Sequence, residues 1–303
     1  NAMLLAFSLT GLGTEALAFF GRMQQAMVKP DDTTFINLLN ACSHGCLADD
    51  SLALLSAMEP KYGIPPTLAH VTCVVDALGR VGRLEEAERK AEGVGQPDVV
   101  LWTSLLGACR LHKDVERAER IFPKALALEP KNTSLHVLMA NIYAAAGRKK
   151  DLAHVRQNIK EHHLHKIPGR SWLSIQGEVH AFVAGDTSHP QIARIHAYSR
   201  ELHEKMKEMG YAPDLDVVLH DETDEWKEEH LCTHSERLAI VCGLLNLPPS
   251  QPIRVLKNLR VCPDCHAATK SIAAVSQRTI ILRDASRFHH FTPDGKCSCN
   301  DKY

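Results

Sequence analysis

The residue types best suited to metal chemistry gather in two short segments of the second half of the chain. His234 stands two residues before Glu236, and Cys262 and Cys265 form a Cys-x-x-Cys pair. One imidazole and two thiolates are ligands that zinc prefers. Three protein ligands leave the fourth tetrahedral position open for water, which zinc makes acidic near neutral pH. We therefore predict a catalytic zinc site held by His234, Cys262 and Cys265.

Glu236 has a different role in this arrangement, because it is not expected to bind the metal. It would take a proton from the water and pass it to a leaving amine. His-x-Glu followed by Cys-x-x-Cys is the pattern of zinc nucleobase deaminases, although the proline that usually precedes the first cysteine is Val261 here. The alternative is a purely structural zinc site beside an incidental glutamate.

A second group of potential ligands follows the first toward the C-terminus. Its members are His266, His289, His290, Cys297 and Cys299. Two thiolates and two imidazoles fill a tetrahedron, so we predict a closed, structural zinc site and two zinc ions per chain. Neighbouring residues of a strand point to opposite faces, so only one of the two adjacent histidines is expected to bind. Such a site would pin the C-terminal tail beside the catalytic zinc. A redox pair or free surface thiols are the alternatives.

The elements around these residues alternate between strand and helix, which indicates an α/β domain after about residue 165. A β-hairpin is expected around Gln176-Gly177, followed by a helix over 191–209. Further elements are expected as strand 216–219, helix 234–245, strand 253–261, helix 265–276 and strands 278–283 and 287–292. Both cysteines of the first site would then lie close to the start of a helix.

The first half of the chain reads as paired helices with an internal repeat. Prolines recur at 30, 66, 97 and 130, a spacing in the low to mid thirties. Between them stand a helix, a turn that contains glycine or histidine, and a second helix with a Glu-Ala pair. A fifth pair is expected over 135–146 and 150–162. Two helices per repeat of this length are typical of an α-solenoid, with an ordinary helical bundle as the alternative. The predicted fold is an α-solenoid followed by an α/β cytidine-deaminase-like zinc domain.

Composition sets wider limits. With 303 residues, 45% of them hydrophobic and 23% charged, the chain is expected to be soluble and to hold two domains. We expect no membrane partner, because no apolar run approaches the length of a membrane span. The formal net charge of −1 neither indicates nor excludes nucleic acid. The start at Asn1-Ala2-Met3 reads as a cut into a longer protein.

Several motifs are similar to those of one known family. They are Lys-Ile-Pro-Gly-Arg-Ser-Trp at 166–172, Phe-Val-Ala-Gly-Asp at 182–186, His-Pro at 189–190, His-Ser-Glu-Arg-Leu-Ala-Ile at 234–240, Pro-Ile-Arg-Val at 252–255, Lys-Asn-Leu-Arg-Val-Cys at 257–262 and Arg-Asp-Ala-Ser-Arg-Phe-His-His-Phe at 283–291. With them the chain resembles the C-terminal part of plant organellar pentatricopeptide-repeat RNA-editing factors of the DYW class. The resemblance implies repeats over 1–98, degenerate extension repeats over 99–165 and a DYW-type deaminase domain over 166–303. The chain ends Asp-Lys-Tyr where that family ends Asp-Tyr-Trp.

The resemblance also implies a function. It is site-specific C-to-U editing of mitochondrial or chloroplast RNA by zinc-dependent deamination of cytidine, with the repeats binding single-stranded RNA. Other editing-factor proteins are potential partners. A related variant of the domain is associated with the reverse, U-to-C amination. Two other functions stay open: a non-catalytic RNA-binding adaptor with structural zinc sites, and a protein-binding scaffold.

Two positions per repeat read one base in this family. They map here to Asn1 with Asp31, and to Thr72 with Asp98. The Asn-Asp pair goes with a pyrimidine, mostly uridine, and the Thr-Asp pair with guanosine. Short polar side chains suit the Watson–Crick edges of single-stranded bases. The alternative is that these residues are helix caps and turn residues.

Residues 172–209 precede the core of the expected deaminase domain. We hypothesise that they form a gating insert that covers the zinc site, so that the isolated protein is weakly active until RNA or a partner moves it. A plain structural β-finger is the alternative.

Overall fold

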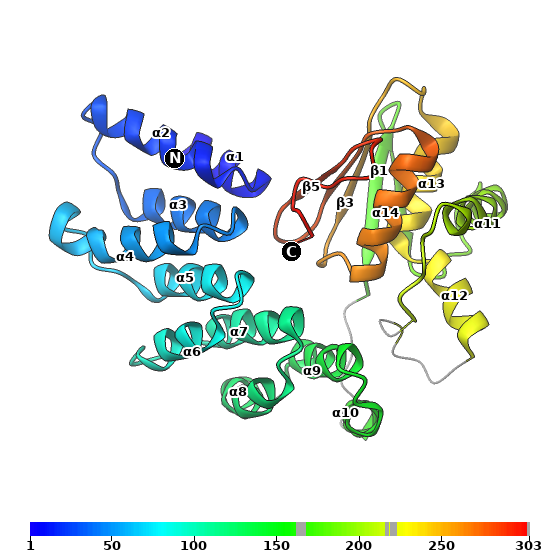
Figure 1. The fold of residues 1–303 in the computed structure, drawn as a ribbon. Coiled ribbons are helices and arrows are strands. Elements are labelled where there is room, and N and C mark those ends of the chain that lie inside the picture. The colour runs from blue at the N-terminus through cyan, green and yellow to red at the C-terminus, as the bar shows by residue number, and fades with distance from the viewer. Residues whose placement is uncertain (162–167, 216–217, 219–222, 302–303) are drawn as a thin grey trace. The chain divides into compact units, whose positions relative to one another are not determined.

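All the regular elements described between residues 1 and 161 are helices (Figure 1). The computed structural model describes residues 1–161, 168–215, 218 and 223–301. The described residues divide into two units, one up to residue 161 and one from residue 168 to 301. Among the described helices, none joins the length to the apolar character that crossing a membrane requires.

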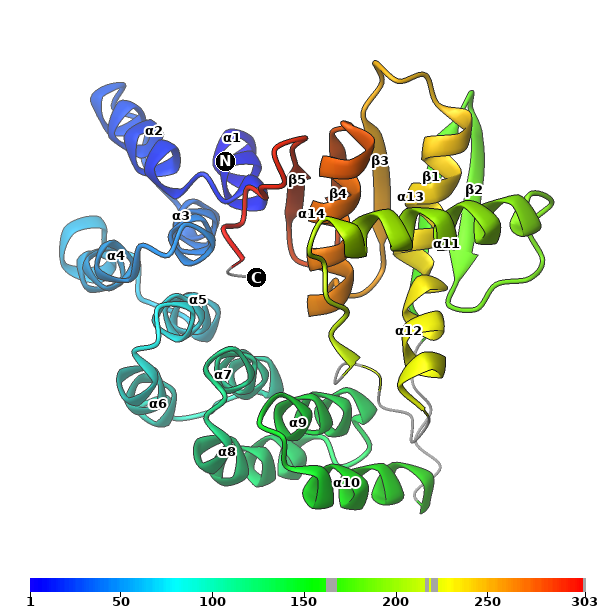
Figure 2. The same cartoon turned by 45° about the vertical axis from the view of Figure 1, so that its right-hand side comes forward.

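The described helices of the first unit form five consecutive pairs. They are α1 (Ala2–Thr10), α2 (Gly13–Gln25), α3 (Asp32–His44), α4 (Ala48–Tyr62), α5 (Leu68–Arg80), α6 (Leu84–Glu92), α7 (Val99–His112), α8 (Val115–Leu128), α9 (Thr133–Ala145) and α10 (Lys149–Glu161). The first helices of successive pairs pack side by side in one row, and their partners form a second row (Figure 2). This arrangement confirms the predicted solenoid of helix pairs.

Histidines and a glycine near the C-terminal ends of the first helices join one pair to the next. The Nδ1 atom of His44 lies 2.8 Å from the carbonyl of Ser8, and Nε2 of His112 lies 2.8 Å from the carbonyl of Gly79. Each ring thereby contacts a carbonyl near the C-terminal end of the preceding helix of the row, in addition to the backbone N–H that this carbonyl already accepts. A Cβ on Gly79 would stand 2.5 Å from the Cβ of Ala108, so α5 and α7 approach closely only because this residue has no side chain.

A five-stranded mixed sheet forms the frame of the second unit. Its strands are β1 (Arg170–Ile175), β2 (Glu178–Val183), β3 (Ile253–Lys257), β4 (Ile280–Arg283) and β5 (Phe288–Phe291), in the order β2-β1-β3-β4-β5. Only β3 and β4 run parallel. Six register pairs join β1 to β2, whereas two join β1 to β3. The predicted hairpin is confirmed, and it is part of the same sheet as β3.

Four described helices complete the second unit: α11 (Ile192–Glu208), α12 (Asp224–Cys232), α13 (Ser235–Asn246) and α14 (Pro263–Ser276). Figures 1 and 2 show α13 and α14 against the sheet, with α11 packed on the far side of both. The predicted fold class is therefore confirmed: a helical solenoid is followed by a small domain that contains a sheet.

Some element boundaries differ from the predictions. The strand expected over 253–261 ends at Lys257, because the chain leaves the sheet there to bring Cys262 to the start of α14. The acidic segment before His234 forms α12, a helix that is not among the predicted elements and that Thr223 caps. The strand expected over 216–219 lies outside the described residues, apart from Val218, which is in no strand.

Candidate metal centres

The first predicted ligand set comes together in the second unit. The ligand atoms of His234, Cys262 and Cys265, here called the open cluster, all lie within 4.8 Å of one another. His234 Nδ1 is 3.2 Å from Cys265 Sγ and 3.7 Å from Cys262 Sγ. Tetrahedral zinc with bonds of about 2.0 to 2.3 Å separates its ligand atoms by about 3.5 Å. The three side chains therefore fit a zinc ion.

Two helix starts position these ligands. His234 is the N-cap residue of α13, and Cys262 is the N-cap residue of α14. The backbone N–H of Cys265 donates to Cys262 Sγ at 3.3 Å, and Pro263 begins the helix without losing a hydrogen bond. Positive partial charge at a helix N-terminus favours thiolates. Hydrogen bonding with Cys265 has the largest effect on the pKa of Cys262, and His234 adds to it. Together they outweigh burial and lower the pKa of Cys262 to about 5. The same contact with Cys262, together with burial, raises the pKa of Cys265.

Glu236 is buried in the first turn of α13, with 2% of its surface exposed. Lys257 Nζ lies 2.8 Å from its Oε1 atom, and Ser235 Oγ donates to Oε2 at 3.1 Å. Burial alone would raise the pKa of Glu236, but the positive charges of Lys257 and His234 outweigh burial and lower it. The structure thus holds a carboxylate ionised inside the protein.

Lys257 was not identified from the sequence. The signal was available, because β3 alternates between buried and exposed residues and Lys257 occupies an inward position of that pattern. A lysine at an inward position needs a buried negative partner. The identity of that partner, more than twenty residues earlier in the chain, could not be read from the pattern.

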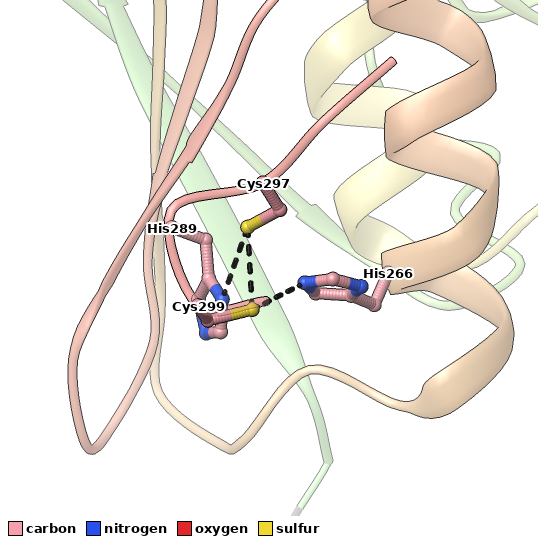
Figure 3. A group of neighbouring side chains, drawn as sticks. All are labelled: His266, His289, Cys297 and Cys299. Carbon is pink, nitrogen blue, oxygen red and sulfur yellow. Dashed lines mark hydrogen bonds between the residues drawn. The ribbon is translucent and has the colours of Figure 1, made fainter. Parts of the chain in front are cut away.

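The second ligand set also comes together (Figure 3). His266, His289, Cys297 and Cys299, here called the closed cluster, are all buried and have ligand atoms within 4.8 Å of one another. His266 Nε2 lies 3.1 Å from Cys299 Sγ, and His289 Nδ1 lies 3.9 Å from Cys297 Sγ. The two sulfur atoms are 3.3 Å apart, and both cysteines are free. These separations suit four-coordinate zinc.

The alternation of β5 decides which of the adjacent histidines joins the closed cluster. His289 is buried, whereas His290 is partly exposed and is not in the group. Each ring in the cluster also has a carboxylate at its other nitrogen. His266 Nδ1 lies 3.5 Å from Asp301 Oδ1, and His289 Nε2 lies 3.4 Å from Asp284 Oδ2. Carboxylates in this position orient a metal-binding imidazole.

A buried polar network links the two helix starts of the open cluster. Arg237, next to Glu236, forms an ion pair with Asp264, which lies between the two cysteines. Tyr211 donates to Asp264 Oδ1 at 2.6 Å and accepts a hydrogen bond from Arg237 Nη2 at 2.6 Å. A buried charge pair persists only with such further hydrogen bonds. The network fixes the start of α13, with His234, relative to the start of α14, with Cys262.

Two other groups of close ligand atoms exist among the described residues: His180 with His189 and Cys242, and His203 with Glu204 and Glu228. In the first, His189 Nδ1 accepts the N–H of Gln191, so the ring proton sits on Nε2 and points to His180 Nδ1, 2.9 Å away. In the second, His203 Nε2 pairs with Glu228 at 2.7 Å. Hydrogen bonding within the protein accounts for both contacts.

Of the four residues predicted to read bases, Asp31 and Asp98 cap helices, whereas Asn1 and Thr72 have other contacts. Asn1 Nδ2 lies 3.0 Å from both carboxylate oxygens of Asp31, so the structure brings this pair together. Asp31 also caps α3, and Asp98 caps α7 by accepting the N–H of Leu101 at 2.8 Å. Thr72 Oγ1 donates to the carbonyl of Leu68, within α5. Base reading by these residues stays a prediction.

Fold and site together define a class: a helical-repeat protein joined to a domain with a deaminase-like His, Glu and Cys arrangement. Comparisons with known families agree with that class. Residues 1–28 match the model of the PPR repeat, residues 112–174 match the E motif, and residues 210–303 match the DYW family of nucleic acid deaminases.

Similar proteins of Arabidopsis thaliana match along 99% of the chain. The chloroplastic pentatricopeptide repeat-containing protein At3g57430 is 45% identical, and the mitochondrial protein At1g56690 is 42% identical. The chain spans 34% and 43% of their respective lengths. The crystal structure of the pentatricopeptide repeat protein PPR10 from maize is similar over 90% of this chain and 36% of its own, with a TM-score of 0.44 and 16% identity. The chain belongs to the plant pentatricopeptide-repeat proteins that carry an E motif and a DYW deaminase domain.

Proposed function

We propose that the second unit deaminates cytidine to uridine in single-stranded RNA, and that the helical repeats bind this RNA. The observation that carries the proposal is the buried, charge-stabilised carboxylate of Glu236 two residues after a ligand of the open cluster. A structural zinc site has no need of such a group. A buried ionised glutamate beside three zinc ligands is suited to moving protons.

His234, Cys262 and Cys265 would hold the catalytic zinc and leave one coordination position free. Zinc, when bound, supplies the Lewis acidity that makes water a nucleophile near neutral pH. Glu236 accepts a proton from the attacking water and delivers it to the amino nitrogen at C4 of cytidine. The C4–N bond then breaks, so that cytidine and water become uridine and ammonia.

Lys257 and Ser235 support this proton transfer by occupying one oxygen each of the Glu236 carboxylate. Lys257 stabilises the ionised form that a general base needs. The closed cluster would hold a second, structural zinc ion, because it offers four protein ligands and no free position.

The repeats would present single-stranded RNA, with Asn1 and Asp31 as one base-reading pair and Thr72 and Asp98 as another. Other editing-factor proteins are the further partners we propose. The names of the relatives place them in chloroplasts or mitochondria, and we propose an organellar location for this protein too.

The decisive experiment compares wild type and Glu236→Ala in editing of a reporter RNA, with zinc content measured in parallel. We expect a loss of at least about 100-fold in the rate of C-to-U conversion, the usual contribution of a general acid–base. Zinc content should stay the same. Equal editing by the two proteins would contradict the catalytic role and favour an RNA-binding adaptor. Conversion of uridine to cytidine in a matched reporter would favour the reverse amination.

A further inference from the structure

One buried carboxylate contacts a histidine of the closed cluster and the residue that precedes Cys262 of the open cluster. Asp284 follows β4 directly, and 1% of its surface is exposed. Its Oδ1 atom accepts three hydrogen bonds from its own turn: from the N–H of Ser286 at 2.8 Å, the hydroxyl of Ser286 at 2.9 Å and the N–H of Arg287 at 3.0 Å. One oxygen is therefore committed to the turn.

The other oxygen faces the clusters. Oδ2 lies 3.4 Å from Nε2 of His289, in the closed cluster. A proton on Nε2 leaves the Nδ1 lone pair of this ring for a metal, and Nδ1 is the atom that faces Cys297. Asp284 thus selects the tautomer of His289 that can bind.

The same Oδ2 atom also accepts the backbone N–H of Val261 at 3.1 Å. Val261 is buried and directly precedes Cys262, the N-cap residue of α14. This hydrogen bond fixes the chain where it turns into the helix. The same helix start carries Cys265 of the open cluster and, next to it, His266 of the closed cluster.

We propose that Asp284 is a positioning residue that couples the two clusters, because one oxygen atom sets both the tautomer of His289 and the position of Cys262. The inference rests on the proposed function only in that both clusters bind zinc. With a metal bound at its Nδ1 atom, His289 would donate more strongly from Nε2 to Oδ2, which would hold the carboxylate in place for the N–H of Val261. Metal binding at the closed cluster would therefore help to hold Cys262 in its place in the open cluster.

Asp284→Asn is the sharpest variant. The three donors of the turn require the amide oxygen on the Oδ1 side. The amide NH2 then faces the N–H of Val261 and the Nε2 proton of His289, donor against donor, and both links are lost. Ser286→Ala is the matched control, because it removes one hydrogen bond from the same carboxylate on the turn side only.

The measurement is protection of cysteine from alkylation in the full chain, titrated with Zn²⁺ against a competing chelator. Mass spectrometry reads the Cys262/Cys265 peptide and the Cys297/Cys299 peptide separately. We expect Asp284→Asn to weaken Zn²⁺ binding at both peptides by about 10- to 100-fold, and Ser286→Ala to change neither by more than about threefold. Unchanged protection of the Cys262/Cys265 peptide in Asp284→Asn would overturn the proposal.

Cys297→Ser tests the coupling without touching Asp284. It should weaken Zn²⁺ binding at the Cys262/Cys265 peptide, and should add nothing to the loss there when combined with Asp284→Asn. Full Zn²⁺ affinity of the open cluster in Cys297→Ser would overturn the coupling. If Asp284→Asn does not fold, Cys297→Ser alone decides by the same criterion. Glu236→Ala should bind Zn²⁺ normally at both peptides, so a failure of the deaminase proposal remains distinguishable.

Discussion

The contact of Lys257 with Glu236 is the residue-scale feature with the clearest functional consequence. A general base must be ionised, and Lys257 lowers the pKa of Glu236 against the effect of burial. Lys257→Met should raise that pKa, so Glu236 becomes protonated at a higher pH. As the pH is lowered, the rate of deamination should therefore begin to fall at a higher pH than in wild type. Lys257→Arg should keep the wild-type profile more nearly. The pH dependence of single-turnover reporter conversion measures the shift.

Lys296→Met is the control for that experiment, because Lys296 pairs with Asp294 at the surface and both side chains are largely exposed. Its profile should match wild type. An acidic limb at the same pH in Lys257→Met and wild type would contradict the role given to Lys257.

At this scale the metal ligands can be predicted from the sequence better than the residues that position them. The residues of the open cluster stand at spacings that zinc chemistry makes recognisable, and those of the closed cluster lie in the last forty residues. Asp284, which follows β4, contacts His289 of the closed cluster, and Lys257 at the end of β3 contacts Glu236. Arg237 pairs with Asp264 of another helix. Such partners depend on how strands pair, which local spacing does not encode.

At the scale of elements, a change of glycine to alanine should have opposite effects at two helical positions, one where α5 and α7 approach closely and one in α2. Gly79→Ala forces a Cβ to within 2.5 Å of that of Ala108 and should destabilise the first unit by about 1 to 3 kcal/mol. Gly21→Ala, in α2, meets no atom within 4 Å and should stabilise it by up to about 1 kcal/mol. Hydrogen exchange of the α5 and α7 peptides measures the first effect. Equal exchange in Gly79→Ala and wild type would argue against tight packing there.

The ion pair between α6 and α8 predicts a dependence of stability on pH. Arg117 Nε lies 2.8 Å from Glu88 Oε2, and both side chains are mostly buried. Burial raises the pKa of Glu88, but Arg117 and Arg120 outweigh it and lower the pKa below its usual value of 4.5. The stabilisation is therefore complete above the unfolded-state pKa and is lost as pH falls through the lower, folded-state pKa.

Glu88→Gln should accordingly reduce the free energy of unfolding by about 1 kcal/mol or more at pH 7 and have little effect at the lowest pH at which the protein stays folded. Urea unfolding at several pH values checks this. Glu85→Gln, an exposed position on the same helix, should change stability little at any pH. A constant difference between Glu88→Gln and wild type across the pH range would contradict the assignment.

The short pairing of β1 with β3 is relevant to the hypothesis that residues 172–209 form a gate. Ser171 pairs in register with Lys257, and its hydroxyl lies 2.9 Å from that of Ser235. If the hairpin gates the open cluster, Ser171→Ala should loosen it and speed alkylation of Cys262 in the metal-free protein. Ser174→Ala, at an exposed position of the same strand, should not. Identical alkylation rates would count against gating.

Most elements could be predicted from the sequence, but not where each ends. Periodicity and turn residues located the helix pairs and the hairpin, because local sequence carries both signals. The early end of β3 could not be seen in the same way, since apolar residues recur at alternate positions through Leu259 and Val261. The chain leaves the sheet there to supply a ligand. Helix α12 was missed because its composition is largely charged and its apolar positions are few.

At the scale of the whole molecule, the division into two units predicts separate responses to metal removal. The first unit has its own core of apolar residues, whereas the C-terminal segment of the second unit meets α14 through the closed cluster. Chelation of zinc should lower the melting temperature of the second unit and leave the first unit's transition in place. Hydrogen exchange with and without chelator, resolved by peptide, measures both. Equal loss of protection in α3–α8 would show that the units do not respond separately.

The start of α14 has a consequence for how such chains can diverge. Cys265 and His266 are neighbours in one helical turn, yet they serve different clusters. A single residue inserted between them would rotate everything that follows by about 100°. His266 would then leave its cluster; if His266 stayed in place, the start of the helix would rotate instead and the hydrogen bond of Val261 with Asp284 would be lost. Loops elsewhere can gain or lose residues as sequences diverge, but the five residues from Cys262 to His266 must keep their number.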